Sequence, residues 1–283
     1  MPGYTLEQRA PDVLVVRDNR VAADWEQWYL LRADAHWDNP LCDRKLYKRH
    51  MDQARERSAG IIHIGDLFCL MQGKYDPRAD KSSVRPEHNC ADYLGAVEDD
   101  AVAQHEPYKD LFVLISDGNH ETAILKRHEY NILRRFCRRL GVPHGSYAGW
   151  ILFRFQAVGG GRRRTVRLFY HHGSGGGGPV TKGTLWPVKH AAIVPDADIV
   201  IGGHIHEQWL FPIERDRVSD AGVTYLDKQY HLCLPTYKQE YTHAGFHTER
   251  GRPPKPLGAW WLKFYYQRDK PGSVGIHFEM AES

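Results

Sequence analysis

Five short polar motifs occur in one order along the chain, and their side chains are of the types that hold divalent metal ions. They are Asp34-Ala35-His36, Gly65-Asp66, Gly118-Asn119-His120, His171-His172-Gly173 and Gly202-Gly203-His204-Ile205-His206. Carboxylate and amide oxygens, together with imidazole nitrogens, suit metal ions of intermediate hardness. The carboxylate of Asp66 has two oxygens, which can bridge two cations roughly 3.5–4 Å apart. The motifs therefore predict a site for two metal ions.

Most of these motifs follow an apolar run of the length and composition of a β-strand. Such runs precede the first three motifs and the last one, over residues 27–31, 61–64, 111–115 and 197–201. Open α/β sheets place their chemistry at the ends of strands. Asp34 and His36 are two residues apart, as are His204 and His206, so in extended backbone each pair would project to one side. We therefore expect the motif side chains to meet at one edge of a sheet.

The elements between the motifs predict an α/β fold. Helical spacing of apolar residues is found in three segments, over 42–58, 87–104 and 122–140, whereas 71–86 is polar and is predicted to be an inserted loop. Strands alternating with helices in this way favour a parallel sheet with crossover helices. The second half predicts a hairpin of residues 150–157 and 165–171, followed by later strands around 209, 223, 232, 260–266 and 274–278 in a mixed or antiparallel sheet.

The motif order Asp-x-His, Gly-Asp, Gly-Asn-His-Glu, His-Gly, Gly-His-x-His resembles that of the calcineurin-like metallophosphoesterase superfamily. The motifs extend from Asp34 to His206, which is most of the chain, and none is missing. Residues 68–75 and 173–178 are also similar to phage-encoded members. The resemblance implies a single domain over residues 1–283, folded as a four-layer α-β-β-α sandwich of two mixed sheets with a dinuclear metal site at strand ends.

The resemblance also implies how the side chains divide between the two metal ions. One ion would be held by Asp34, His36, Asp66 and His206. The other would be held by Asp66, Asn119, His172 and His204. A hydroxide bridging the ions would attack phosphorus, and His120, which is outside both sets, would protonate the leaving oxygen as general acid, with Asp117 as a candidate to orient it. Charge supports an anionic substrate, because two divalent ions, two carboxylates and one hydroxide leave about one positive charge.

Several assignments leave alternatives. His172 directly precedes Gly173 and is favoured over His171, while His63 lies within an apolar strand and is expected to pack in the core. The glycine-rich run 173–178 could bring backbone amides to a phosphate or could be a plain connector. Two basic clusters, at residues 134–139 and 162–164, could hold a nucleic-acid backbone, although a solvated face is the commoner use of such charges.

The composition is that of an ordinary globular protein. The formal net charge of +3 is too small to argue for a nucleic-acid partner by itself. The five cysteines form no Cys-x-x-Cys pair, so neither a disulfide framework nor a thiolate zinc site is indicated. The N-terminal residues lack the apolar stretch of a signal peptide, and no segment approaches the ~20 apolar residues of a membrane helix. We expect a cytoplasmic protein that has no membrane partner.

The sequence as a whole predicts a metal-dependent phosphoester hydrolase. Its cofactors would be two divalent metal ions, with Mn²⁺ favoured and Fe, Zn or Ni as alternatives. A phosphodiesterase acting on nucleotides or nucleic acid is the first expectation, to which the arginine clusters and the inserted loop contribute. A phosphomonoesterase acting on nucleotides or proteins is the second, and a non-catalytic metal-binding scaffold is the third.

Overall fold

The computed structural model describes most of the chain. The described residues are 3–70, 80, 83–159, 163–176, 178, 181–241, 248, 251, 253–267 and 273–281. The loop predicted over residues 71–86 lies mostly outside them, as do Arg162 of the second basic cluster and Gly177 of the glycine-rich run. In the described part, no helix is long and apolar enough to cross a membrane. All five cysteines are free, as the sequence indicated.

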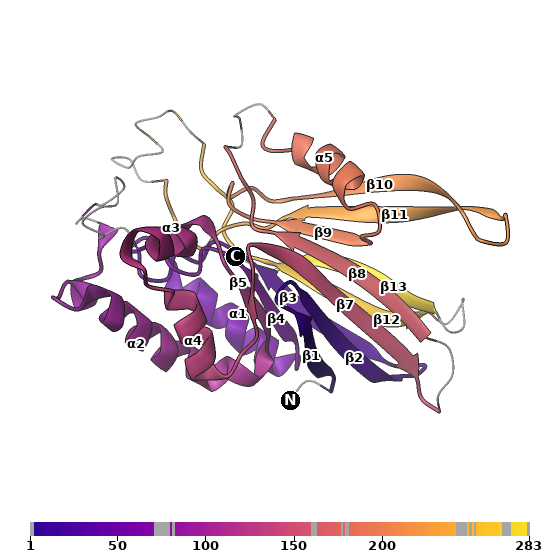
Figure 1. Cartoon of the computed structure of the whole chain (residues 1–283), viewed down its shortest axis with the longest axis horizontal. Coiled ribbons are helices and arrows are strands. Elements are labelled where there is room, and N and C mark those ends of the chain that lie inside the picture. Colours follow the sequence, from indigo (N-terminus) through magenta and orange to yellow (C-terminus); the bar gives the residue numbers. More distant parts are fainter. Residues whose placement is uncertain are drawn as a thin grey trace.

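Two mixed sheets form the centre of the molecule (Figure 1). The six-stranded sheet has the order β13-β12-β3-β4-β5-β6, in which β3 to β6 are parallel and β12 and β13 antiparallel. Its strands are β3 (Glu26–Arg32), β4 (Gly60–Ile64), β5 (Phe112–Ser116), β6 (His144–Gly145), β12 (Trp260–Gln267) and β13 (Ser273–Met280). The parallel half is built from the apolar runs that precede the first three motifs, so three motifs leave this sheet at the same edge.

The seven-stranded sheet has the order β1-β2-β7-β8-β9-β11-β10. Its strands are β1 (Thr5–Ala10), β2 (Val13–Val21), β7 (Ala148–Ala157), β8 (Arg163–His171), β9 (Ile199–Gly202), β10 (Trp209–Val218) and β11 (Thr224–Cys233). The predicted hairpin is confirmed as the antiparallel pair β7–β8, and β8 runs parallel to β9, so the last two motifs also leave at one edge. The sequence analysis missed β1 and β2.

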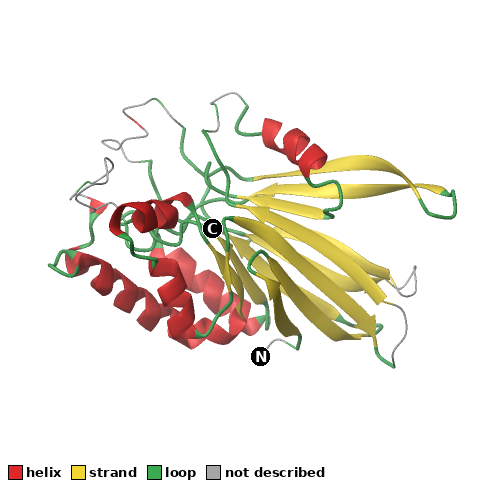
Figure 2. Ribbon diagram, viewed as in Figure 1, coloured by secondary structure: helices red, strands yellow, loops and turns green. Residues whose placement is uncertain are grey.

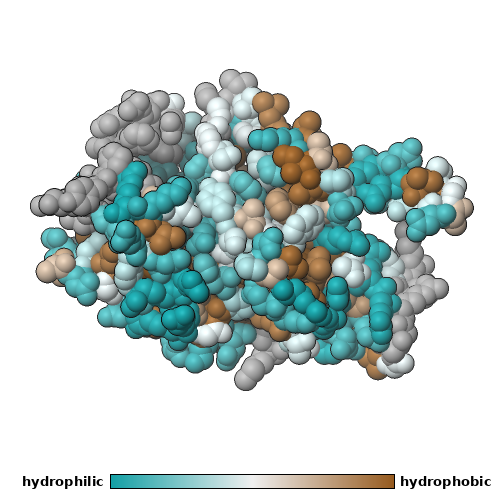
Figure 3. Space-filling model, viewed as in Figure 1, coloured by the Kyte–Doolittle hydropathy of each residue, from teal (hydrophilic) through white to brown (hydrophobic). Residues whose placement is uncertain are grey.

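Helices cover both outer faces, which makes the fold the expected four-layer α-β-β-α sandwich (Figure 2). The helices are α1 (Arg44–Glu56), α2 (Tyr93–His105), α3 (Asn119–His128), α4 (Ile132–Leu140) and α5 (Leu185–Ile193). Short 3-10 helices, η2 (Pro86–His88) and η3 (Glu106–Leu111), flank α2. Only α5 covers the seven-stranded sheet among the described residues, and Figure 3 shows hydrophobic residues gathered over it, in accord with exposed Leu185 and Val188.

Three apolar clusters hold the layers together. One joins α1, α2 and α4 to the six-stranded sheet, a second fills the space between the sheets, and a small third lies beneath α5. Tyr29 and Phe153 show the second cluster well, because they come from different sheets and their ring centroids are 4.9 Å apart. Burial of such aromatic surface is the main source of stability for the sandwich.

The prediction of one helix over residues 122–140 is wrong. The structure has two helices there, separated at Glu129, whose left-handed backbone (φ 53°) ends α3. Asn131 then begins α4 by accepting a hydrogen bond from the Arg134 N–H group through its side chain. A left-handed residue commonly ends a helix, and an asparagine N-cap commonly begins one. These two signals divide the segment although the helical spacing of its apolar residues is continuous.

Candidate metal centre

The five motifs converge where the parallel strands of both sheets end. β4 ends directly before Gly65-Asp66, and β9 ends at Gly202 of the last motif. The Gly65 position fits only glycine, because φ is +78° and a Cβ atom would lie 2.1 Å from the His172 ring. Similarly, a Cβ atom on Gly118 would lie 2.2 Å from the backbone nitrogen of Asp66. Gly65 therefore lets motifs of the two sheets touch, and Gly118 lets two motifs of the six-stranded sheet touch.

One group of ligand atoms consists of Asp34, His36 and His206, which together could hold a metal ion. His206 Nε2 lies 3.3 Å from Asp34 Oδ1 and 3.3 Å from His36 Nε2, and the third side of this triangle is 4.0 Å. Atoms bound ~2.1 Å from one ion are themselves roughly 3–3.4 Å apart at ordinary coordination angles. Asp34 Oδ1 and His36 Nδ1 are buried and have no hydrogen-bond partner among the residues that the structure describes. A cation in this triangle would satisfy Asp34.

A second group consists of Asp66, His172 and His204, with Asn119 among them. His172 Nε2 lies 3.3 Å from Asp66 Oδ2 and 3.1 Å from Asn119 Oδ1, and the same oxygen is 2.7 Å from His204 Nδ1. Asp34 links the two groups, because its Oδ2 accepts a hydrogen bond of 2.8 Å from the backbone N–H group of His204. The donor chemistry and spacing of both groups fit divalent ions. The bridging role of Asp66 stays a prediction.

The candidate ligands share an unusual backbone conformation. Asp34, His36, Asp66, His204 and His206 all have positive φ, between 47° and 70°. The expectation that Asp34 and His36, or His204 and His206, project from extended backbone is therefore wrong. Each pair still reaches one region, but it does so from two left-handed residues with one ordinary residue between them. The left-handed conformation costs non-glycine residues free energy.

Two histidines near the motifs, His171 and His63, lie outside both ligand groups. His172 lies in the second group, whereas His171 accepts a hydrogen bond from the Gly173 N–H group and packs on Tyr147. His63 is fully buried within β4, and burial holds its pKa well below the usual range, in accord with a packing role. The carboxylate of Asp117 lies 2.9 Å from His144 Nε2, and its role in orienting His120 stays a prediction.

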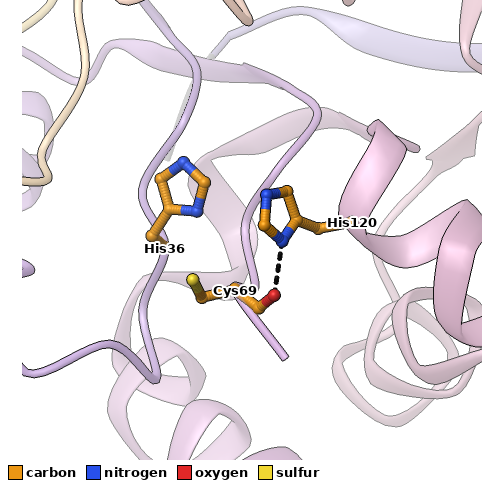
Figure 4. A group of neighbouring side chains, drawn as sticks. All are labelled: His36, Cys69 and His120. Carbon is orange, nitrogen blue, oxygen red and sulfur yellow. Dashed lines mark hydrogen bonds between the residues drawn. The ribbon is translucent and has the colours of Figure 1, made fainter. Parts of the chain in front are cut away.

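His120 is held beside the centre by the segment that follows Asp66. Its Nδ1 donates a hydrogen bond to the carbonyl oxygen of Cys69, and its Nε2 lies 3.8 Å from Asp66 Oδ2. Figure 4 shows His36 and His120 with Cys69 beside them. These three residues also lie close enough together to hold a cation. Cys69 was not predicted, and burial raises the pKa of its thiol to about 12, which disfavours the thiolate that a metal would need.

Two buried carboxylates fix that segment. Asp38 accepts hydrogen bonds from the N–H groups of Cys69 (2.5 Å) and Leu70 (2.8 Å). Glu121 accepts them from Phe68 (2.9 Å), Gly118 (2.9 Å) and Asp66 (3.2 Å). Glu121 follows His120 directly and could have been found from the Gly-Asn-His-Glu motif. Asp38 has no comparable signal in the sequence.

Glu240, which was not predicted from the sequence, contacts His206 from 34 residues further along the chain. Glu240 Oε2 lies 3.1 Å from His206 Nδ1, and Lys238 Nζ is 2.8 Å from the other carboxylate oxygen. Burial opposes the charge on Glu240, but His206 and Lys238 hold its pKa far below the usual range. A carboxylate on the outer nitrogen of a histidine ligand fixes the ring and makes it a stronger base.

We predict that Glu240→Gln weakens metal binding by about 10–100-fold, because the outer partner of His206 loses its charge. Titration of metal into metal-free protein measures this, and turnover at saturating metal should fall much less. Glu207→Gln is the matched control, since Glu207 adjoins His206 in sequence but pairs with Lys255 at 2.6 Å. Equal affinities in the two variants would remove Glu240 from the centre.

One histidine of each group, His172 and His206, has a raised pKa that metal binding must overcome, whereas burial lowers the pKa of His36 and His204. Burial lowers the pKa of His172 and His206, but the carboxylates of Asp66 and Asp34 outweigh it. The pKa of His172 is thereby raised to about 10 and that of His206 to about 9. In metal-free protein these imidazoles therefore hold protons at neutral pH. A metal ion must displace those protons.

We predict opposite pH dependences for stability and for metal affinity. Because both pKa values are raised above 6.5 on folding, their stabilising contribution is complete below pH 6.5 and is lost as the pH rises through 9 to 10. Metal affinity should rise over the same range, by about tenfold per pH unit for each proton displaced. Denaturant unfolding in chelator and metal titrations at pH 6.5, 8 and 9.5 test this. An affinity that does not change with pH would contradict it.

Comparison with known proteins gives little beyond this geometry. No protein-family model matches the chain, and no curated protein matches it. A solved structure of a conserved uncharacterized protein from Streptococcus pneumoniae, described as a predicted phosphoesterase, has a TM-score of 0.34 and 11% identity, covering 91% of this chain and 100% of that one. Vps29 complexed with Zn²⁺ from Entamoeba histolytica has a TM-score of 0.37 and 10% identity, covering 90% of this chain and 99% of that one.

Vps29 from Chaetomium thermophilum is similar to the same degree, with a TM-score of 0.38 and 9% identity, covering 90% of this chain and 97% of that one. Likenesses this weak say nothing about activity, and they give no support to a phage-type sub-family. The motifs and the geometry carry more. In motif order, in its two-sheet sandwich and in the convergence of all five motifs on one edge, this chain resembles the calcineurin-like metallophosphoesterase superfamily.

Proposed function

We propose that the chain is a dinuclear metal-dependent phosphoester hydrolase that acts on phosphodiesters. The observation that carries the proposal is the pair of adjoining ligand groups, Asp34–His36–His206 and Asp66–His172–His204. Six side chains from distant parts of the sequence meet there, and five of them come from residues with left-handed backbone. Packing of a hydrophobic core would not require such a gathering of polar side chains. Two bound divalent ions would supply positive charge to the phosphoryl oxygens and lower the pKa of an attacking water.

The protein's own part in the reaction falls mainly to His120. The Nδ1 atom of its ring donates to the Cys69 carbonyl, so Nε2 is the atom that can exchange a proton with a substrate. The same ring is 4.9 Å from that of His36, between ring centroids, which places it at the rim of the first group. Protonated at Nε2, it would deliver that proton to the leaving oxygen. Asp38 and Glu121 act as positioning residues, because they hold the segment to which His120 is bound.

Phosphomonoester hydrolysis and a metal-binding scaffold are the alternatives. Both would use the same ligand groups, but a scaffold would have no need of a histidine fixed at the rim. Diesters are preferred here because of the arginines described in the next subsection. A cytoplasmic setting, nucleic acid as a partner and Mn²⁺ as the metal stay predictions.

The test is hydrolysis of a bis-aryl phosphate diester and an aryl phosphate monoester by metal-stripped protein, before and after reloading with Mn²⁺, Zn²⁺, Fe²⁺ or Ni²⁺. We expect no turnover without metal and faster turnover of the diester after reloading. Faster turnover of the monoester would make the protein a phosphatase. Two bound metals with neither activity would favour the scaffold.

A matched pair of variants ties the result to the site. His172→Ala should lose metal and turnover, whereas His171→Ala, one residue earlier but outside both groups, should keep them. Metal-independent turnover, or equal effects of the two substitutions, would reject the proposed centre.

A further inference from the structure

The arginines of two distant sequence clusters come together along β1, where they line two neighbouring hollows. One hollow, of about 740 Å³, is lined by Arg9, Arg134 and Arg138 together with His144. The other, of about 390 Å³, is lined by Arg17, Arg154, Arg163 and Arg164. We call the seven arginine side chains among them the arginine track. They come from α4, β1, β2, β7 and β8, so no single stretch of sequence shows them as one surface.

The two hollows are joined through one carboxylate. Glu7 lies 2.7 Å from Arg9 in the first hollow and 2.9 Å from Arg17 in the second. Arg17 and Arg154 are directly paired in the parallel register of β2 and β7, and Gln156 is paired with Arg163 across β7 and β8. The track therefore continues from α4 over the β1 edge onto the outer face of the seven-stranded sheet.

Most of the track is uncompensated. In the described part of the chain, no ion pair joins Arg134, Arg138, Arg154, Arg163 or Arg164 to a carboxylate. Their neighbours Arg135 and Arg139 differ, because both pair with the buried Glu98 and so fasten α4 to α2. The four arginines of α4 thus have two roles. Arg135 and Arg139 hold α4 against α2, whereas Arg134 and Arg138 have no ion pair within the described part of the chain.

A chain of contacts connects the first hollow to the candidate metal centre. His144 lines it, and His144 Nε2 is 2.9 Å from the carboxylate of Asp117. Asp117 directly precedes Gly118-Asn119, and Asn119 is part of the second ligand group. A polyanion lying along the track would therefore end beside the residues that we assign to phosphoester hydrolysis.

We propose that the arginine track binds the phosphate backbone of single-stranded nucleic acid and leads it to the metal centre. Guanidinium groups match phosphate oxygens in geometry and charge. Among the described aromatic residues, only Phe155 lines either hollow, and it is buried, so binding would follow phosphates and not base sequence. A flexible single strand can enter both hollows and cross β1 between them, whereas a flat bilayer would touch only their rims. Binding of the strand does not depend on the proposed phosphodiesterase activity, but the role of the strand as substrate rests on it.

The test is binding of a fluorescent thymidine oligonucleotide to the full chain in chelator, at a series of salt concentrations. We compare wild type with the triple variant Arg154→Glu, Arg163→Glu, Arg164→Glu. Each phosphate contact on a single strand contributes roughly 0.7 to the slope of log affinity against log salt, so losing three should reduce the slope by about 2. We expect affinity to fall at least about tenfold at low salt.

The matched control moves the same charge change elsewhere. Lys45→Glu, Lys189→Glu, Arg217→Glu alters net charge equally but lies on α1, α5 and β10, and it should leave the slope unchanged. A second track variant with glutamine at positions 154, 163 and 164 guards against misfolding of the charge-reversed protein. Equal losses in track and control variants, no binding by wild type, or binding only to phosphatidylserine vesicles would each overturn the proposal.

The bis-aryl diester separates this inference from the proposed function. Track variants should hydrolyse that small substrate as fast as wild type, because a single diester bound at the metal centre is too short to extend to the arginines of the hollows. Wild type that hydrolyses it but ignores the oligonucleotide would reject the track alone. Wild type that binds the oligonucleotide through the track but hydrolyses no ester when loaded with metal would reject the proposed function alone.

Discussion

Asp66→Asn should remove bound metal and hydrolysis together. Asparagine has nearly the size of aspartate and keeps one side-chain oxygen. That oxygen can still accept a hydrogen bond from the backbone N–H group of His120, which donates to Asp66 Oδ1 at 3.0 Å in the wild-type protein. It removes the negative charge that faces His172 Nε2 at 3.3 Å. Since a metal ion supplies several kcal/mol of transition-state stabilisation, we expect kcat/KM to fall by about 10³-fold or more. Metal content after gel filtration and kcat/KM are measured on the same samples.

The control for this substitution is Asp117→Asn. Asp117 also follows the end of a parallel strand, but its carboxylate pairs with His144 and belongs to neither ligand group. We expect that variant to retain both metals. Full activity and two retained metals in Asp66→Asn would exclude Asp66 as the bridging ligand.

His120→Ala should leave the metals in place and slow the chemical step. General acid catalysis contributes about 10²–10⁴-fold, and its loss is felt most by leaving groups of high pKa. Turnover of alkyl esters should therefore fall by that factor, whereas nitrophenyl esters, whose leaving group needs no proton, should be affected much less. The measurement is kcat for a series of aryl and alkyl diesters, with metal content determined alongside.

The geometry also offers a rival role for His120. His36, Cys69 and His120 are close enough to hold an ion, so His120 could be a ligand. In that case His120→Ala and Cys69→Ala would each lower the metal content. If Cys69 supplies only its backbone carbonyl to the His120 ring, Cys69→Ala should retain metal and keep nearly normal turnover.

The motif residues could be predicted because each lies next to a strand whose apolar run is visible locally. Ile61 to Ile64 delivers Asp66, and Ile199 to Gly202 delivers His204, so strand order alone brings them to one edge. The residues that complete the centre could not be found this way. Glu240 reaches His206 only because residues 236–237 bond the backbone oxygen of Asp34, a contact that joins segments about 200 residues apart.

The missed strands have a similar explanation. β1 has the sequence Thr-Leu-Glu-Gln-Arg-Ala, which shows no apolar alternation, and it forms because it pairs with β2 at the sheet edge. β2 contains Asp18, a fully buried carboxylate that Arg20 and the Trp25 indole neutralise or bond. A local sequence pattern reveals buried apolar residues. It does not reveal a buried charged residue such as Asp18, because the groups that compensate its charge are brought to it only by the fold.

The left-handed backbone of the candidate ligands narrows the sequences that this site can accept. Each such residue costs about 1–2 kcal/mol relative to ordinary backbone, so the five together cost an amount comparable with the ~5–15 kcal/mol net stability of a whole domain. Aspartate and histidine are among the few residue types that tolerate this conformation and also bind metal. Selection for stability alone would favour glycine at these positions, and glycine would delete the ligand. These positions are therefore constrained twice, by backbone conformation and by ligand chemistry.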